Sequence, residues 1–585
     1  MRIAVFLSML LALGACAGPR AAQGPSGAVE VSIIAFNDFH GALQPPREAV
    51  PTIAAGGGET RVPAGGAAYL ASAVSALRER SPNSVVVSAG DLISASQLVS
   101  AQFLDEPTIL AMNMIGLDFN AVGNHEFDRG EAELRRMQSG GCAQHTRAQP
   151  CRVDSDFPGA RFRFLAANVR RGGGDTILPA YGIRSFGSGE AQVRVAFIGL
   201  TLKETPTLVT PAGVAGLSFA DEADTINALI PQLRAEGADA IVVLIHQGLS
   251  FPKEYDLGGC ASMEGDLLPI LARLDSEVDL VVSGHTHDSY ICDYGRVDPS
   301  RPFLVTSAAR RGTMLTHITL AVDPVRGVVD RRAEQLIVQG EGFQGPAGAV
   351  ELSADHPRFE RHPAVEQLVA RYAAASAAIG ARVVGRLAAP ALREEAPSGE
   401  SVLGNLIADA GLAATRDPQT GGAQIAFMNQ TGVRNDIVPG QGGAVTFGQL
   451  FEAQPFGNTW VVKSMTGRQI RGVLEQQFES GTNTVKRPIM LLPSAGLTYA
   501  YDLTRPAGQR IIDLRLKGVP IVEEQVYRVA TNSFLAAGGD NFTIFREGTD
   551  PFEGASDLDA LERYLASGGQ RTPPQANRIR RLSPP

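Results

Sequence analysis

Seven short apolar segments rich in β-branched residues constrain the first half of the chain more than any other feature. Longer amphipathic stretches, such as residues 67–79 and 223–236, lie between several of them. Strands that alternate with helices in this way predict a layered α/β domain. The expected strands are residues 31–36, 84–89, 118–122, 193–200, 239–245, 279–283 and 302–307.

A glycine-rich segment at residues 339–348 interrupts this alternation, as is typical of a domain boundary. The next segment predicts one amphipathic helix, because its apolar side chains recur at i, i+3, i+4 and i+7, and Gly380 can cap its end. The four apolar positions are Val365, Leu368, Val369 and Tyr372. A second α/β pattern begins near Val383. We therefore expect a first domain over residues 28–340, a linker with a connecting helix over 341–382, and a second domain over 383–585.

The first residues have the form of a secretory signal, since Met1 and Arg2 precede an apolar run that is too short to span a bilayer. The run ends in Leu13-Gly14-Ala15-Cys16, which resembles the bacterial lipoprotein box, where the cysteine is lipidated. An ordinary signal cleaved beyond Cys16 is the alternative. We expect a signal peptide over residues 1–15 and a lipid anchor on a bacterial membrane, facing the periplasm.

Four cysteines remain after Cys16, and an even number in an exported chain favours disulfides. The polar loop CAQHTRAQPC makes Cys142–Cys151 the natural pair, which leaves Cys260–Cys292. A cysteine-rich metal site is the other interpretation, but the sequence has no C-x-x-C spacing. The formal net charge of −9 argues against a nucleic acid polymer as partner, whereas a small anion can still bind near a metal or an arginine cluster.

Asp, Asn or His residues follow five of the predicted strands, and ligands of α/β sheets bind at the carboxyl ends of strands. A single such residue is usually part of a solvated turn or of the core, but these five strand ends hold five of the nine histidines. Carboxylates, imidazoles and an amide suit two divalent cations about 3.5–4 Å apart, an arrangement that hydrolyses phosphoesters. The segments are Asn37-Asp38-Phe39-His40, Gly90-Asp91, Gly123-Asn124-His125-Glu126, His246 and Gly284-His285-Thr286-His287.

These segments, in this order, resemble the calcineurin-like metallophosphoesterases, and the variants NDFHG, GNHEFD and GHTH resemble the 5′-nucleotidase branch. The resemblance covers nearly the whole mature chain. It implies a four-layer α-β-β-α domain that a helix joins to a smaller α/β substrate-binding domain, with rotation of one domain against the other. It also implies two divalent metal ions, with Zn, Mn and Co all open: Asp38, His40 and His287 would bind one, Asn124, His246 and His285 would bind the other, and Asp91 would bridge them.

In the family pattern His125 stabilises the charge that develops on the phosphate, and Asp128 orients His125. A helix N-cap is the other interpretation of Asp128, and the two roles are compatible. Some relatives carry glutamine at position 287, so His287 could change the metal preference but not the mechanism. The attacking group would be a metal-bound water or hydroxide, since the cations strongly lower the pKa of the water.

The second domain is expected to bind the substrate. The segment MNQTGVRNDI resembles the family's N-x-G-G-x-R loop, with Thr431 in place of one glycine. Two aromatic rings and a carboxylate suit a nucleoside, because bases stack between rings and a carboxylate accepts ribose hydroxyls. Alone, either phenylalanine would more often be a core residue. The expected residues are Asn429, Arg434, Phe456, Asn458, Phe534 and Asp540, with Arg393, in a segment that departs from the family pattern, as a second phosphate arginine.

These residues predict an enzyme that hydrolyses 5′-nucleotides to nucleoside and phosphate. Cleavage of UDP-sugars, 2′,3′-cyclic nucleotide 2′-phosphodiesterase/3′-nucleotidase activity and a sulfur-oxidising thiosulfohydrolase activity stay open within the family. The aromatic pair favours a nucleotide over the sulfur substrate. A non-catalytic nucleotide-binding lipoprotein is the alternative from another class, and the complete metal-ligand set with His125 and Asp128 argues against it.

Overall fold

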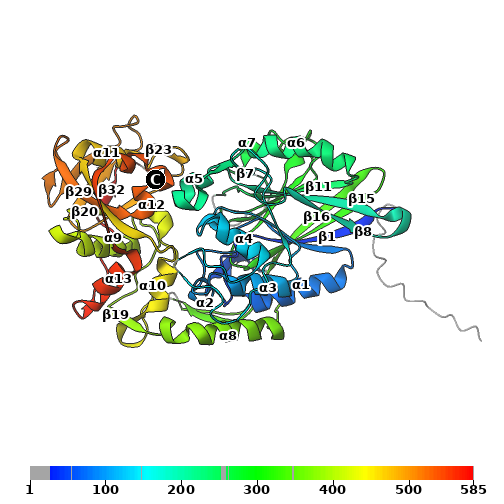
Figure 1. Cartoon of the computed structure of the whole chain (residues 1–585), viewed down its shortest axis with the longest axis horizontal. Coiled ribbons are helices and arrows are strands. Elements are labelled where there is room, and N and C mark those ends of the chain that lie inside the picture. The colour runs from blue at the N-terminus through cyan, green and yellow to red at the C-terminus, as the bar shows by residue number, and fades with distance from the viewer. Residues whose placement is uncertain are drawn as a thin grey trace, which may run out of the picture.

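The computed structural model describes residues 27–54, 56–146, 148–251, 259–260, 262–345 and 348–583. The expected signal peptide and Cys16 lie outside the described residues, so the lipid anchor stays a prediction. Across the described ranges, no helix combines the length and the apolar character that a membrane span requires. Figure 1 shows a larger lobe that carries the first half of the chain and a smaller lobe that carries the C-terminal part.

Two six-stranded sheets form the centre of the first domain. The first sheet has the order β16-β15-β1-β4-β5-β6, with β1 (Val29–Phe36), β4 (Ser84–Ser88), β5 (Phe119–Ala121), β6 (Arg163–Leu165), β15 (Met314–Asp323) and β16 (Gly327–Ile337). The second has the order β13-β14-β12-β11-β9-β8, with β8 (Tyr181–Phe186), β9 (Val193–Thr201), β11 (Ala240–His246), β12 (Leu280–Ser283), β13 (Ser289–Asp293) and β14 (Leu304–Ala308).

The inner faces of both sheets share one apolar core, in which Ile33 and Val87 of the first sheet join Val242 and Leu280 of the second. Outer-face side chains of β1 and β4 pack with α1 (Ala67–Arg80) and α3 (Glu106–Ile115). Those of β9 and β11 pack with α6 (Glu222–Ala235) and α7 (Leu268–Leu271). The inner strands are therefore buried on both faces, which explains their nearly continuous apolar sequences. This arrangement confirms the expected four-layer α-β-β-α domain (Figure 1).

All seven predicted strands are present, but β6, β8, β13 and the long hairpin of β15 and β16 were not predicted. The second strand of this hairpin is partly exposed along most of its length and carries the charged run Asp330-Arg331-Arg332, so its sequence lacks a continuous apolar signal. Parallel pairing of β1 with β4, and of β11 with β9 and β12, brings the carboxyl ends of these strands to the same edge of their sheets.

The predicted connecting helix is α8 (Pro363–Gly380), which lies along the first domain beside α1 and α3 (Figure 1). Its apolar stripe belongs to that domain's core, where the Tyr372 ring meets the Phe103 ring edge-on at 5.1 Å. The Tyr372 hydroxyl donates to Asp154 at 2.8 Å. The expected glycine cap is wrong, because Gly380 is the last helical residue and the right-handed Ala381 follows it.

The second domain is built around a five-stranded sheet of order β25-β20-β29-β22-β30. The helix α9 (Val402–Thr415) packs so closely on this sheet that a Cβ at Gly411 would lie 2.3 Å from the buried Trp460 ring. The strands are β20 (Ile425–Asn429), β22 (Thr459–Thr466), β25 (Leu491–Pro493), β29 (Val526–Asn532) and β30 (Thr549–Ser556). Smaller sheets contain β19 (Val383–Leu387), β21 (Ala444–Thr446), β26 (Leu497–Tyr501), β27 (Ile511–Leu516), β28 (Val519–Pro520), β31 (Gln570–Arg571) and β32 (Ile579–Arg581).

The other helices are short. They are α2 (Leu98–Ala101), α4 (Glu131–Ser139), α5 (Thr205–Leu208), α10 (Phe447–Ala453), α11 (Gly467–Glu475), α12 (Ser533–Ala536) and α13 (Asp557–Ala566). Two further antiparallel strand pairs are present. They are β2 (Ala49–Ile53) with β3 (Glu59–Pro63), and β17 (Phe343–Gly345) with β18 (Gly348–Val350). Cys142 pairs with Cys151 and Cys260 with Cys292, which confirms both predicted disulfides.

The packing of α8 predicts a specific loss of stability. Leu368→Ala should lower the free energy of unfolding of the first domain by about 2–5 kcal/mol, because Leu368 is buried in its core. The matched control is Gln367→Ala, because Gln367 lies on the same helix but outside that core. This variant should change the free energy of unfolding by less than about 0.5 kcal/mol. Denaturant unfolding measures the change in the free energy of unfolding for both variants. Equal changes would mean that α8 does not stabilise the core of the first domain.

Candidate active site and metal centre

Five loops at the carboxyl ends of strands meet at one edge of the sandwich. Asp38 and His40 follow β1, Asp91 follows β4 and Asn124 follows β5 in the first sheet. In the second sheet His246 ends β11, and His285 and His287 follow β12. The structure thus brings all seven predicted metal ligands to one place, from segments up to about 250 residues apart in sequence.

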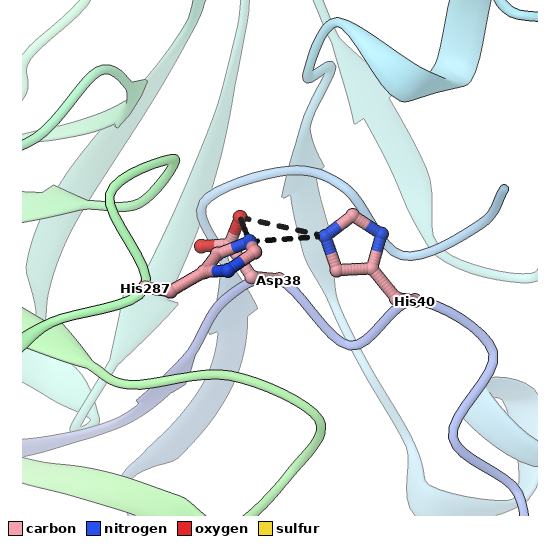
Figure 2. Close-up of side chains that lie close together, drawn as sticks. All are labelled: Asp38, His40 and His287. Atoms are coloured by element: carbon pink, nitrogen blue, oxygen red, sulfur yellow. Dashed lines mark hydrogen bonds and ion pairs between the residues drawn. The ribbon is translucent and has the colours of Figure 1, made fainter. Parts of the chain in front are cut away.

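Asp38, His40 and His287 form the first group that could hold a cation (Figure 2). The two Nε2 atoms of His40 and His287 are 3.2 Å apart, and Nε2 of His287 lies 3.4 Å from Asp38 Oδ1. His40 Nδ1 is 3.0 Å from the carbonyl oxygen of Ser94, which can only accept, so Nδ1 carries the proton. The unprotonated Nε2 therefore points into the cluster, as a metal ligand requires.

Asp38, Asp91 and His246 form the second group. Nε2 of His246 lies 3.0 Å from Asp91 Oδ2 and 3.2 Å from Asn124 Oδ1. His246 Nδ1 donates to the carbonyl of Ala89 at 2.7 Å, which again leaves Nε2 as the ligand atom. Asp91 Oδ2 also lies 3.8 Å from His40 Nε2, so this carboxylate faces both groups. This donor set fits two divalent cations with Asp91 between them.

His285 completes the cluster beside His246, with the ring centroids 5.2 Å apart. Its backbone N–H donates to Asp38 Oδ2 at 2.9 Å, which ties the loop after β12 to the loop after β1. Burial, followed by the charge of His246, lowers the pKa of His285 to about 4. A neutral imidazole is the form that binds a metal.

The ligand positions carry strained backbone. Five of them, Asp38, His40, Asp91, His285 and His287, have φ between 48° and 74°, a region that side chains other than glycine rarely adopt. Each such residue costs about 1–3 kcal/mol and persists only where its surroundings hold it. Close approach of the loops supplies that hold: a Cβ at position 123 would lie 2.1 Å from Asp91 Oδ1, so only glycine fits there.

Glu126 is a site residue to which the sequence analysis gave no role. Its buried carboxylate accepts backbone N–H groups from Asp91 at 3.0 Å, Leu92 at 2.8 Å and Gly123 at 2.6 Å. Burial, and then the charge of Asp91, raises its pKa to about 8. Glu126 therefore binds the loop after β4 to the loop after β5. The sequence signal for this role was an acidic residue inside GNHEFD that is not one of the predicted metal ligands.

His125 and Asp128 form a pair with 2.8 Å between Nδ1 and Oδ2. Burial by itself would lower the pKa of His125, but Asp128 and then Asp91 outweigh it, so the pKa is raised above its usual value. The N-cap interpretation of Asp128 is wrong, because α4 begins at Glu131 after Gly130 and Asp128 ends the short 3-10 turn at 125–127.

A cavity of about 680 Å³ lies between the two domains and is lined by residues of both. His125, His285 and His287 contribute from the first domain, and the second contributes Phe456 and Phe534. Both phenylalanine rings are partly exposed, so neither is a core residue. The Phe456 ring lies 5.7 Å from the His125 ring at 14°, a stacked contact across the domain boundary. Three of the proposed metal ligands, Asn124, His285 and His287, thus line the same cavity as the two aromatic residues.

Asp540 lines the same cavity and is 5% exposed. Asn429 Nδ2 donates to Asp540 Oδ2 at 2.8 Å, and Thr431 donates to the same oxygen. Thr431, which replaces the family's glycine, therefore helps to hold this carboxylate. Asn458 also lines the cavity, and its Oδ1 accepts from the Ser533 hydroxyl at 2.9 Å.

Both predicted phosphate arginines, Arg393 and Arg434, line the cavity. Arg393 Nη1 donates to the carbonyl of Arg434 at 3.2 Å, and the Arg434 guanidinium lies 5.7 Å from the Phe456 ring centroid. Arg310 and Arg311 of the first domain line it too and were not predicted. Burial, and then Arg311, Arg310 and Arg393, lowers the pKa of Arg434 to about 10.

Comparison with known protein families gives one match for each of the two domains. A family model described as calcineurin-like phosphoesterase matches residues 31–289, and one described as 5′-nucleotidase, C-terminal domain, matches residues 383–547. The crystal structure of a 5′-nucleotidase precursor from Thermus thermophilus is similar over 95% of this chain and 100% of that chain, with 26% identity and a TM-score of 0.73.

Two curated relatives are similar in sequence over most of the chain. Human 5′-nucleotidase is 24% identical over 96% of this chain and 91% of that protein. Endonuclease YhcR of Bacillus subtilis (strain 168) is 28% identical over 93% of this chain. The chain spans only 40% of the length of that Bacillus protein.

The cluster geometry predicts the metal content of one variant. His40→Ala should lower the bound metal by about one of two equivalents, because it removes a nitrogen donor from the group with Asp38 and His287. His317→Ala is the matched control, since His317 lies on β15 and bonds Ser32, and it should bind metal as the unchanged protein does. Elemental analysis after dialysis measures both, and full metal content in His40→Ala would contradict the assignment.

Proposed function

The chain belongs to the 5′-nucleotidase family of calcineurin-like phosphoesterases, which are metal-dependent hydrolases, and we propose that it releases phosphate from 5′-nucleotides. One observation carries the proposal: a single cavity has His125 and three of the metal ligands on one wall, and two partly exposed phenylalanines with Asp540 on the other. The first wall suits a phosphoester and the second suits a nucleoside.

The seven ligand residues would hold the two cations, and Asp91 would bridge them. When bound, divalent cations would polarise the phosphoryl oxygens and lower the pKa of a water molecule, so that it loses a proton and can attack phosphorus. His125 lies against this cluster, with its backbone N–H donating to Asp91 Oδ1 at 3.0 Å. Its raised pKa favours an imidazolium, which donates a hydrogen bond to a phosphoryl oxygen as negative charge builds there. Asp128 holds the ring in that orientation.

The second domain would bind the rest of the nucleotide. Phe456 and Phe534 would stack on the base, and Arg434 would bind the phosphate through its guanidinium fork. Asn429 and Thr431 both donate to Oδ2 of Asp540, so Oδ1 remains to accept a ribose hydroxyl. Ser533 donates to Oδ1 of Asn458, so the Asn458 amide N–H₂ remains to donate to the base.

The compartment is part of the same proposal. The apolar leader that ends at Cys16 supports export and a lipid anchor facing the periplasm. Two disulfides in the mature domain support an oxidising compartment.

Phosphate release from AMP by the mature, metal-loaded protein tests this proposal. Turnover that disappears with a chelator and returns with Zn, Mn or Co is the expected result. Binding of AMP without turnover would instead support a non-catalytic binding protein. UDP-glucose and 2′,3′-cyclic AMP, assayed alongside, separate the finer alternatives within the family.

His125→Ala should lower kcat for AMP by about 10²–10⁴, the usual effect of removing one positioned group that stabilises transition-state charge. Metal content should stay unchanged, because Asn124 and not His125 is the proposed ligand. Steady-state kinetics and elemental analysis of the same preparation measure both. Loss of a metal equivalent in this variant would show that His125 has been given the wrong role.

Phe534→Ala should weaken nucleotide binding by about 1–3 kcal/mol, the loss that follows removal of one stacking ring. Hydrolysis of p-nitrophenyl phosphate, which carries no base, should fall much less. Phe545→Ala is the control, since Phe545 is 1% exposed in the core of the same domain. That variant should lower the melting temperature and keep the preference for AMP over the generic ester. A parallel loss on both esters in Phe534→Ala would return Phe534 to a structural role.

A further inference from the structure

Thr431 lies where the family pattern has a glycine, in the short 3-10 turn Gln430–Gly432 that follows β20. Its hydroxyl oxygen accepts from Asn429 Nδ2 at 2.7 Å and donates to Oδ2 of Asp540. Asn429 Nδ2 also donates to that carboxylate oxygen, at 2.8 Å. With glycine at position 431, Asn429 would be the only side chain among the described residues that donates to Asp540.

A chain of hydrogen bonds fixes the direction in which Asn429 and Thr431 donate. The backbone N–H of Leu535, in α12, donates to Asn532 Oδ1 at 2.8 Å. Asn532 therefore presents its N–H₂ group to Asn429 Oδ1, also at 2.8 Å. The Asn429 amide in turn directs its own N–H₂ group to Thr431 and Asp540. Because the Thr431 hydroxyl accepts one of these hydrogens, its own proton is left for Asp540.

The Asp540 carboxylate depends on these two donors. Asp540 is 5% exposed, and its backbone φ of 51° lies in the left-handed region that favours glycine. Burial raises the pKa of Asp540, and the hydrogen bond from Thr431 is the largest influence that opposes this rise, followed by the one from Asn429. The Thr431 hydroxyl therefore helps to keep a buried carboxylate both ionised and in one orientation.

The other oxygen of Asp540, Oδ1, is the one that remains for a ligand. No described residue donates to it, and Asp540 lines the cavity together with Phe534. A Cβ at Gly539 would lie 2.4 Å from the Phe534 ring, so this ring lies directly against the turn that carries Asp540. A fixed acceptor beside a stacking ring discriminates between nucleosides with and without sugar hydroxyls, because it stays unpaired when the hydroxyls are missing.

We propose that Thr431 is a positioning residue that acts through Asp540 and makes this protein select nucleotides with ribose hydroxyls over nucleotides without them. Rotation of the carboxylate would break both bonds to Oδ2, so Oδ1 stays directed into the cavity before the substrate binds. A glycine has no hydroxyl and cannot supply the second donor, so this selection depends on the residue that this chain carries at position 431. The inference rests on the proposed function.

The test compares kcat/KM for AMP and for 2′,3′-dideoxy-AMP, which lacks both hydroxyls, using the mature, metal-loaded protein. Thr431→Val keeps the shape of the side chain and removes its hydroxyl. It should lower kcat/KM for AMP by about 10-fold, the lower end of the range for one hydrogen bond to a charged group. The change should be mainly in KM, since the metal ligands and His125 lie on the other domain. The rate on the dideoxy substrate should change by less than about threefold.

Thr431→Ser keeps the hydroxyl and should retain the preference for AMP over the dideoxy substrate. Thr431→Gly restores the residue of the family pattern, so it should behave as Thr431→Val does. Thr459→Val is the matched control, because the Thr459 hydroxyl also donates to a carboxylate, that of Glu553 at 3.0 Å, but outside the cavity. This control should leave the ratio of the two rates unchanged.

Melting temperature and metal content show whether each variant folds, and Thr431→Gly replaces Thr431→Val if the latter does not. Equal losses on both substrates, or an unchanged ratio, would overturn the positioning role of Thr431 while leaving the proposed function intact. Equal rates on AMP and the dideoxy substrate in the unchanged protein would overturn it as well. Failure of the unchanged protein to hydrolyse any 5′-nucleotide would instead overturn the proposed function, and this inference with it.

Discussion

The active-site region depends on how closely the loops at the strand ends approach one another. An oxygen of Asp91 lies where a side chain at position 123 would begin, and the buried carboxylate of Glu126 binds the backbone of both loops. Five ligand positions adopt left-handed backbone that is costly by itself. This strain can persist because the loops leave strands whose side chains are buried on both faces of a four-layer domain. The stability of the sandwich therefore supports the arrangement of the ligands.

The chemistry and the recognition of the substrate lie on different domains. The metal ligands and His125 belong to the first domain, whereas the exposed phenylalanines and Asp540 belong to the second. Only the contact between domains creates the shared cavity, through the stack of Phe456 on His125 and the bond from Arg311 to Asn435. Two ion pairs, Lys486 with Glu264 and Arg487 with Asp266, add contacts between the domains. The relative position of the domains thus decides whether a bound nucleoside places its phosphate at the cluster.

Local charge in this protein differs from the global charge. The chain carries a formal charge of −9, yet four arginines, Arg310, Arg311, Arg393 and Arg434, line the cavity. A substrate near the cavity responds mainly to these arginines, because distant surface charges are screened by salt over about 10 Å. An acidic protein can therefore bind an anionic substrate without binding a polyanion over its surface.

The sequence by itself determined seven strands of the first domain, the chemical types of the metal ligands and the pairing of the cysteines. Strand periodicity and the polar residues at strand ends are local signals, and parallel pairing makes those ends converge. Tertiary structure decided the role of Glu126 and brought Arg310 and Arg311 to the cavity, where Arg310 contacts Glu48 across 262 residues of sequence. It also made α8 part of the first core and ended it without the glycine cap that a local pattern suggested. A local pattern specifies which residues form an element, but only the packed chain brings distant charges together and decides which of them share a cavity.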